Sequence, residues 1–197
     1  MMKRIAEASP RLKARIAGVF SLLGILAAVS GEFIIRGRWE SAGDFIAISC
    51  MVAVTLVLYG LFKPVNRGLA LLAASFGLVG LTFGAFRWNP RGVDITVAFG
   101  GFSCLANGYL IFRSTFLPRI LGPLMAIAGV CWLTFLVPLL ARPVSPYNLA
   151  SALLVQALVM LWLLVMGVNV QRWKERASAA DRVGTTSTRL VNAVIGH

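Results

Sequence analysis

The sequence predicts an all-α membrane protein, a polytopic bundle of six transmembrane helices with both termini in the cytoplasm. Hydrophobic residues make up 58% of the 197 residues and charged residues only 13%, whereas an ordinary soluble domain has about 45–50% and about 25%. The charges are unevenly spread, and the runs between them approach or exceed the ~20 residues that a helix needs to cross a bilayer. Lys and Arg are concentrated in the two tails and in alternate connections.

The uncharged runs define the helices in chain order. The longest run separates Arg142 from Arg172 and has 29 residues, and the next separates Arg119 from Arg142 and has 22. In lipid such runs must be helical, because a helix satisfies its own backbone hydrogen bonds. They are too long and too uniformly apolar for the alternating strands of a barrel. The predicted spans are 14–35, 45–62, 68–86, 93–112, 120–140 and 147–170.

These spans divide the chain into a transmembrane domain and two basic cytoplasmic tails. The domain covers 14–170, the first tail 1–13 and the second 171–197. Beyond Ala177 the second tail is polar and rich in Ser and Thr, so it has too little apolar surface for a core and we expect it to be mobile. The first span could instead be a cleaved signal peptide, although its apolar run is longer than the 7–15 residues typical of a signal core.

Two arginines between spans four and five predict a tight hairpin. Within one buried helix, Arg113 and Arg119 would cost about 2.5–3.5 kcal/mol each. A turn at Ser114–Pro118 removes this cost, because both side chains then reach the headgroups. Pro118 suits the first turn of the next helix, where its missing N–H is not needed.

The distribution of Lys and Arg predicts the orientation. Fourteen of the 19 lie in the two tails and in the connections after spans two and four, and five lie on the opposite side. Cytoplasmic loops carry the excess of Lys and Arg, so both termini should lie inside. The basic tails should contact anionic lipid headgroups at about 1 kcal/mol per cation. Orientation and lipid contact explain the net charge of +12 without a nucleic acid partner.

Four long segments resemble a known family. GYLIFRSTFLPRILGPLMAIAGVCWLT at 108–134 and LWLLVMGVNVQRWKE at 161–175 are similar to the bacterial membrane family catalogued as domain of unknown function 4386. ARIAGVFSLLGILAAVSGEFIIRG at 14–37 and LYGLFKPVNRGLALLAASF at 58–76 resemble the same family. The likeness is ordered and covers most of the chain. It implies a multi-helix fold in the bacterial cytoplasmic (inner) membrane, but no reaction, substrate or ligand.

The chain departs from the family pattern at two places. The connection between Arg38 and Phe45 is shorter than the one expected after the first span. Val155-Gln156 stands where a glycine–glutamate pair is expected early in the last span. If that glutamate is functional in relatives, this chain lacks the function.

No combination of residue types indicates catalysis, a cofactor or a metal site. The one histidine, His197, is the last residue, and no Asp or Glu lies near the middle of a span, whereas proton relays usually depend on intramembrane ionisable groups. Three unclustered cysteines, Cys50, Cys104 and Cys131, argue against disulfides and metal ligation. We expect no enzyme activity. An intramembrane enzyme would have Cys50 or Cys104 as its only plausible nucleophile.

Four polar residues are candidate contacts within the spans. Glu32 lies near the outer end of the first span, where it can pair with Arg36 four residues later or face a ligand. Asn107 and Gln156 are the strongest polar groups inside the spans, and Asn169 lies near the inner end of the last one. Amides in lipid usually bridge helices, at about 0.6–2 kcal/mol each. Contact with a substrate is the alternative.

Small residues four apart predict places of close helix packing. Gly80 and Gly84 form such a pair in span three, and Gly100, Cys104 and Gly108 form a series in span four. The pattern suits packing within the bundle and also suits a homo-oligomer.

Two classes of function follow from these observations. The first is a non-enzymatic membrane protein with a structural or regulatory role, acting through a membrane partner protein or its own copies. The second is a small transporter or channel subunit for a neutral or apolar solute, which requires a cavity that reaches Asn107 or Gln156.

Overall fold

The computed structural model describes residues 10–33, 40–86, 95–180 and 182, and it is helical throughout, with no strand in these ranges. Its elements are α2 (Pro10–Phe33), α3 (Glu40–Phe62), α4 (Arg67–Ala85), α5 (Ile95–Arg113), α6 (Leu121–Leu133), the 3₁₀ helix η2 (Thr134–Leu136) and α7 (Pro138–Val165). A further helix, Val170–Ala180, follows α7; we call it the C-terminal helix. The predicted all-α class is confirmed.

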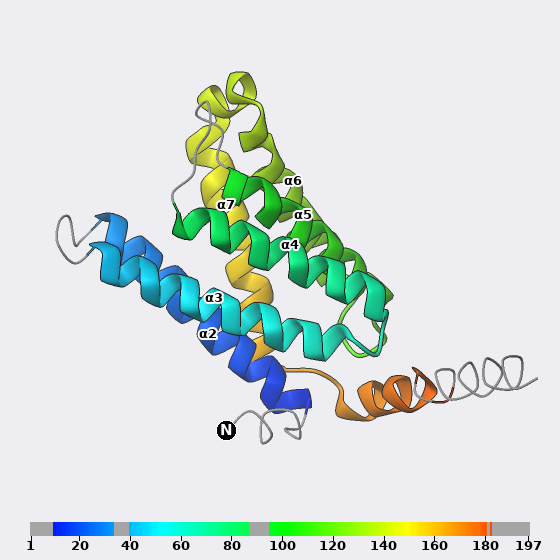
Figure 1. The fold of residues 1–197 in the computed structure, drawn as a ribbon. Coiled ribbons are helices and arrows are strands. Elements are labelled where there is room, and N and C mark those ends of the chain that lie inside the picture. Colours follow the sequence, from blue (N-terminus) through cyan, green and yellow to red (C-terminus); the bar gives the residue numbers. More distant parts are fainter. Residues whose placement is uncertain (1–9, 34–39, 87–94, 181, 183–197) are drawn as a thin grey trace, which may run out of the picture.

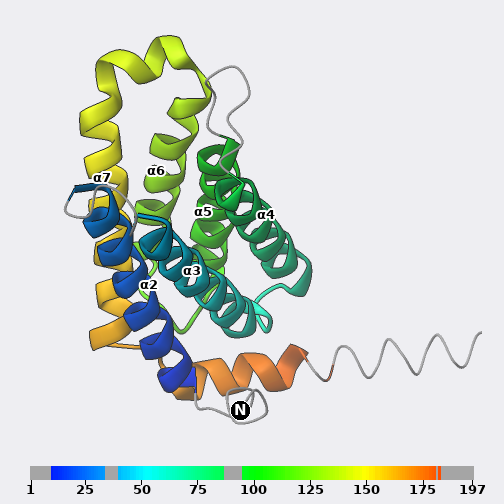
Figure 2. The ribbon, with the colours of Figure 1, turned by 60° about the vertical axis from the view of Figure 1, so that its left-hand side comes forward.

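The helices form a ring (Figures 1 and 2). Each helix from α2 to α7 packs on the next one in the chain, and α7 packs back on α2. Gly18 on α2 makes this closure possible, since a Cβ there would lie 2.8 Å from both the Leu164 Cβ and the Met160 carbonyl oxygen of α7. The first and last helices of the ring are therefore direct neighbours.

Three segments are long and apolar enough to cross a membrane. They are Phe45–Phe62, α4 and α5, with mean hydropathies of 2.4, 1.8 and 1.5. Ala150–Val165 and Val170–Ala180 would add a fourth as one broken span, with a bend of 96° between them, and Leu121–Leu136 is a shorter apolar helix. Length and composition thus indicate embedding in a membrane, and the count of six spans stays a prediction.

The last two predicted spans differ in their boundaries from the helices. Span five was expected to run to residue 140, but the helical run ends at Leu136, and Pro138 begins α7. Proline is favoured at the first position of a helix because its missing N–H needs no partner there. The last helix accordingly starts nine residues before the predicted 147 and ends at Val165 instead of 170.

The connection between α5 and α6 contains the two arginines discussed above. Arg113 is the last residue of α5, and α6 begins only at Leu121. Pro118 was expected in the first turn of α6, but it lies before the helix, where its carbonyl accepts a hydrogen bond from the Leu121 N–H at 3.1 Å. The helix starts late because Phe116 and Leu117, which are 4% and 5% exposed, turn into the core.

The C-terminal helix lies across one end of the ring (orange in Figure 1). The chain leaves α7 at Gly167, whose φ of 66° suits glycine because it has no Cβ. We call this end the basic end, because it carries exposed cations on the connections and on the C-terminal helix: Lys63, Arg67, Arg113, Arg119 and Arg172.

Hydrogen bonds join the C-terminal helix to the ring. The Trp173 Nε1–H donates to the Leu61 carbonyl at 2.9 Å, and Arg172 Nη1 donates to the Thr115 carbonyl at 3.2 Å. The Lys13 ammonium lies 5.8 Å from the centre of the Trp173 ring. The second tail was expected to begin at residue 171, but residues 171–180 form a helix that packs on the ring through Trp173.

Candidate functional site

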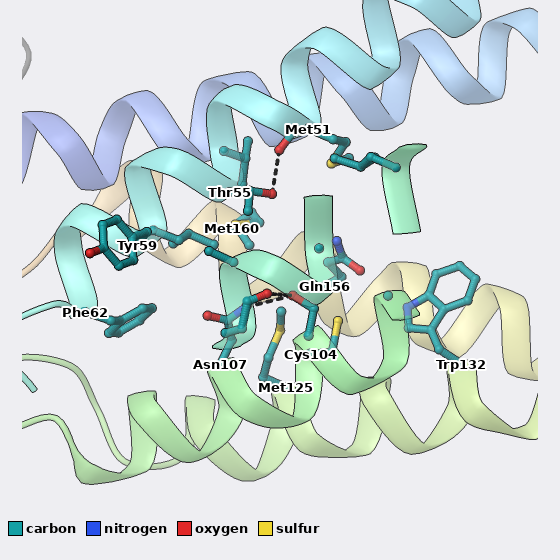
Figure 3. A pocket seen from close by; sticks show the side chains of 18 of the residues that line it. Met51, Thr55, Tyr59, Phe62, Cys104, Asn107, Met125, Trp132, Gln156 and Met160 are labelled. Carbon is teal, nitrogen blue, oxygen red and sulfur yellow. Dashed lines mark hydrogen bonds between the residues drawn. The ribbon is translucent and has the colours of Figure 1, made fainter. Parts of the chain in front are cut away.

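A cavity of about 240 Å³ lies inside the ring (Figure 3). Five helices line it, from α3 to α7, and none of the described lining residues is charged. An apolar protein cavity of about 150 Å³ already admits benzene, so this one has room for a small organic molecule. The side chains labelled in Figure 3 include Met51, Tyr59, Phe62, Met125, Trp132 and Met160.

The cavity is closed towards the basic end. There Phe62 and Leu58 are 1% and 7% exposed, and Phe62 stacks on Phe116 with ring centroids 6.2 Å apart. Towards the opposite end the lining residues are only half-buried, among them Leu81 and Thr96. Burial along the lining therefore indicates access from the end opposite the C-terminal helix.

Asn107 and Gln156 both line this cavity. The Asn107 Nδ2 faces the Ser103 Oγ at 3.4 Å, and the Ser103 hydroxyl donates to the Ala73 carbonyl at 2.9 Å. Ser103 thus connects α5 to α4, and Asn107 donates to this serine from one turn further along α5. The half-buried Gln156 has no side-chain hydrogen bond to any residue that the structure describes. The structure brings these two predicted residues together in one space (Figure 3).

The cavity has other hydroxyl groups. The Thr55 hydroxyl donates to the carbonyl of Met51, four residues earlier in the same helix, at 2.8 Å. Such a local bond satisfies a hydroxyl in an apolar helix. Thr55 therefore presents a polar group that already has its partner, unlike Gln156.

The other two predicted polar residues lie elsewhere. Asn169 is the N-cap of the C-terminal helix: its Oδ1 accepts from the Arg172 N–H at 3.2 Å, and its own N–H donates to the Phe116 carbonyl at 3.2 Å. Asparagine is a favoured N-cap, and an Asn closely following a helix-ending glycine was the sequence signal for it. Glu32 belongs to α2, but its side chain lies outside the described part.

The predicted small residues are divided between packing contacts and the cavity. A Cβ on Gly80 would lie 3.0 Å from the Phe99 Cβ, and one on Gly84 would lie 3.0 Å from the Thr96 Cγ2, so both are at the contact of α4 with α5. Cys104 lines the cavity. Gly100 also lines it, and no atom lies within 4 Å of an added Cβ. The Gly100 backbone nitrogen would lie 3.5 Å from a Cβ on Gly80, at the contact of α4 with α5, while its own Cβ direction faces open space.

The close contact between α5 and α6 was not predicted from the sequence, except for Gly108. A Cβ on Gly108 would lie 2.8 Å from the Gly122 carbonyl oxygen, and one on Gly122 would lie 2.8 Å from the Gly108 carbonyl oxygen. Gly101 and Gly129 form the same reciprocal pair, at 3.0 and 2.9 Å. We call these four residues the glycine seam. The signal was there: both helices carry two glycines seven residues apart.

The residues with chemical reactivity are dispersed. Cys50 and Cys104 are buried. The half-buried Cys131 accepts a weak hydrogen bond from the Ser151 hydroxyl at 3.8 Å. Over the described residues, no three His, Cys, Asp or Glu side chains gather as a metal site would require. The cavity offers shape, apolar surface and amides, which are features of a binding site.

Helices with this composition, packed around an apolar cavity, define the class of the protein as an α-helical membrane protein. The family DUF4386, described as a domain of unknown function, matches residues 36–88 and 83–167. The chain belongs to this family, as its sequence segments indicated. No curated protein and no solved structure matches it.

Proposed function

We propose that this protein binds a small, uncharged, largely apolar molecule in the cavity of its helix ring, without carrying out a reaction on it. The observation that carries the proposal is the cavity of about 240 Å³, whose described lining is uncharged but includes the amides of Asn107 and Gln156. Ligand sites are typically apolar hollows with a few polar groups that orient the ligand. A charged ligand would be left without a counterion among these side chains, which is costly away from water.

The proposal places the ring in a bacterial cytoplasmic membrane, with six spans and both termini inside. The Lys and Arg excess supports this orientation, because the exposed cations of the α3–α4 and α5–α6 connections share the basic end with the C-terminal helix. The shortest span is Leu121–Leu136, about 24 Å long at 1.5 Å per residue. A bilayer can thin around a short span at modest cost. The basic end would face anionic headgroups.

Cavity filling tests the binding proposal. In lipid nanodiscs, the wild-type protein should be stabilised against heat by some members of a panel of small uncharged apolar compounds. Gly100→Leu should lose this stabilisation, because the new side chain occupies the cavity. Gly60→Leu is the matched control: no atom lies within 4 Å of its added Cβ either, but Gly60 is not among the lining residues. The proposal fails if no compound distinguishes wild type from Gly100→Leu.

Binding without a reaction suits a regulatory or structural protein that acts through a membrane partner or a second copy. Transport of the same ligand is a second candidate, and the closed basic end of the cavity favours it. An alternating-access transporter exposes its site to one side at a time. Proteoliposomes should then accumulate the bound compound faster than empty liposomes and faster than those containing Gly100→Leu. Binding without such flux would leave the regulatory role.

A further inference from the structure

The closed end of the cavity contains an amide whose orientation is fixed by its neighbours. A serine hydroxyl has one proton, and Ser103 donates it to the Ala73 carbonyl at 2.9 Å. Towards Asn107, 3.4 Å away, the Ser103 oxygen can therefore only accept. Asn107 must present its NH₂ group to Ser103, which leaves its Oδ1 as the free end of the amide.

The free oxygen is an acceptor without a donor. No described residue donates a hydrogen bond to Asn107 Oδ1, and Asn107 is only 9% exposed while it lines the cavity. An occupant without a donor would take the place of water beside this oxygen and leave it unpaired, which is unfavourable, so an occupant that brings a donor to this position is favoured.

We infer that the cavity selects uncharged, mainly apolar molecules that carry a hydrogen-bond donor, such as an alcohol, and binds the donor at Asn107 Oδ1. The rest of the ligand would lie along Met125 and Met160, towards Trp132 (Figure 3). Methionine side chains adapt to varied apolar shapes, so this part of the site discriminates little. Gln156, which also lines the cavity, can offer either its NH₂ or its oxygen, so it does not distinguish donors from acceptors. That selection comes from the Asn107 Oδ1 at the closed end.

This inference rests on the proposed function, and matched ring compounds separate the two. Cyclohexane, cyclohexanone and cyclohexanol are similar in size, and only the alcohol has a donor. Their affinities should be measured by calorimetry on the full chain in nanodiscs. The alcohol should bind about fivefold more tightly than the ketone, as expected for one hydrogen bond. If none of the three binds, the proposed binding function fails; if alcohol and ketone bind equally, only the selection of a donor fails.

Three variants locate the selection. Asn107→Leu should abolish the preference for the alcohol over the ketone, because the leucine has no acceptor. Ser103→Ala keeps the amide but removes the group that orients it, so the amide can offer its NH₂ to the ketone and the preference should shrink. It is also the second test if Asn107→Leu does not fold. Thr82→Val is the control, because the Thr82 hydroxyl has its partner in the Leu78 carbonyl at 2.9 Å and Thr82 is not among the lining residues; its preference should equal wild type. Retention of the full preference in Asn107→Leu or Ser103→Ala, or its loss in Thr82→Val, would overturn the inference.

Discussion

Two contacts of the ring, α5 with α6 and α3 with α4, differ in how closely the helix backbones approach each other. In the first, the glycine seam brings the two backbones so close that no Cβ fits between them. In the second, the helices meet through side chains, since a Cβ on Gly77 would lie 3.3 Å from the Thr55 Cγ2, and side chains such as Val54 and Leu81 line the cavity. In lipid there is no hydrophobic driving force for helix association, because the lipid tails are themselves apolar. Close van der Waals packing holds the helices together instead. The seam should therefore hold the ring together, and the opposite wall should leave room for a ligand.

The largest expected effect comes from breaking the seam. Gly108→Leu puts a side chain against the Gly122 carbonyl oxygen at 2.8 Å and the Ala126 backbone nitrogen at 2.9 Å. Neither can move without shifting α6, so we expect a loss of about 3 kcal/mol or more, the upper range for overpacking. Equilibrium unfolding of purified protein in mixed micelles measures it. A loss below ~1 kcal/mol in the free energy of unfolding would show that the glycine seam is not a strongly stabilising contact of the ring.

The matching substitution on the cavity side should be tolerated. Gly100→Leu meets no atom within 4 Å of its Cβ, and replacing a helix-interior glycine removes a penalty of about 0.8–1 kcal/mol. We expect unchanged stability or a gain of up to about 1 kcal/mol in the same unfolding assay. If Gly100→Leu and Gly108→Leu were equally destabilising, the contrast between seam and cavity would be wrong.

A smaller loss of stability is expected where the C-terminal helix packs on the ring, at the closed end of the cavity. Trp173→Phe removes the hydrogen bond from the indole to the Leu61 carbonyl, and we expect a cost of about 1–1.5 kcal/mol. The effect should be local: trypsin in micelles should cut after Arg172 or Lys174 faster than in wild type. The α5–α6 pair should keep its resistance to cleavage. Unchanged cleavage in the C-terminal helix would mean that Trp173 does not hold it on the ring.

The smallest expected loss of stability concerns the start of α4. The Asn66 side chain accepts the Leu69 N–H at 3.1 Å as the N-cap. Asn66→Ala should cost about 0.5–1 kcal/mol, as for an exposed cap, while Asn66→Asp should retain most of the stability. Thermal unfolding of both variants checks this. A loss as large as that of Gly108→Leu would place the firm part of the ring on the α3–α4 side.

The sequence predicted the helices well, because the alternation of charge and apolar runs marks where a chain can enter lipid. It also singled out Asn107 and Gln156, because polar groups are rare in such runs. What it could not supply was the direction in which each residue faces. Gly100 and Gly101 are neighbours, yet Gly100 lines the cavity and Gly101 packs in the seam, because one residue turns a helix by about 100°. Only pairing with α6 distinguishes them.

The extent of the last helix was missed for a different reason. The uncharged run continues through Asn169, so composition alone extends the span to residue 170. The helix stops at Val165 because Gly167 takes a left-handed conformation, and the helix that follows turns by 96° from α7. A terminating glycine followed by a capping asparagine is readable in a sequence. In predicting the end of the span, the length of the apolar run was given more weight than this signal.

The contact of Gly18 with Leu164 and Met160 has a consequence for biosynthesis. The ribosome synthesises α2 long before α7. Until nearly the whole ring has been synthesised, α2 can therefore pack on α3 but not on α7. Throughout that interval the surface around Gly18 lacks its final neighbour and is open to lipid or to other nascent chains. The fold is completed only when its last long helix arrives.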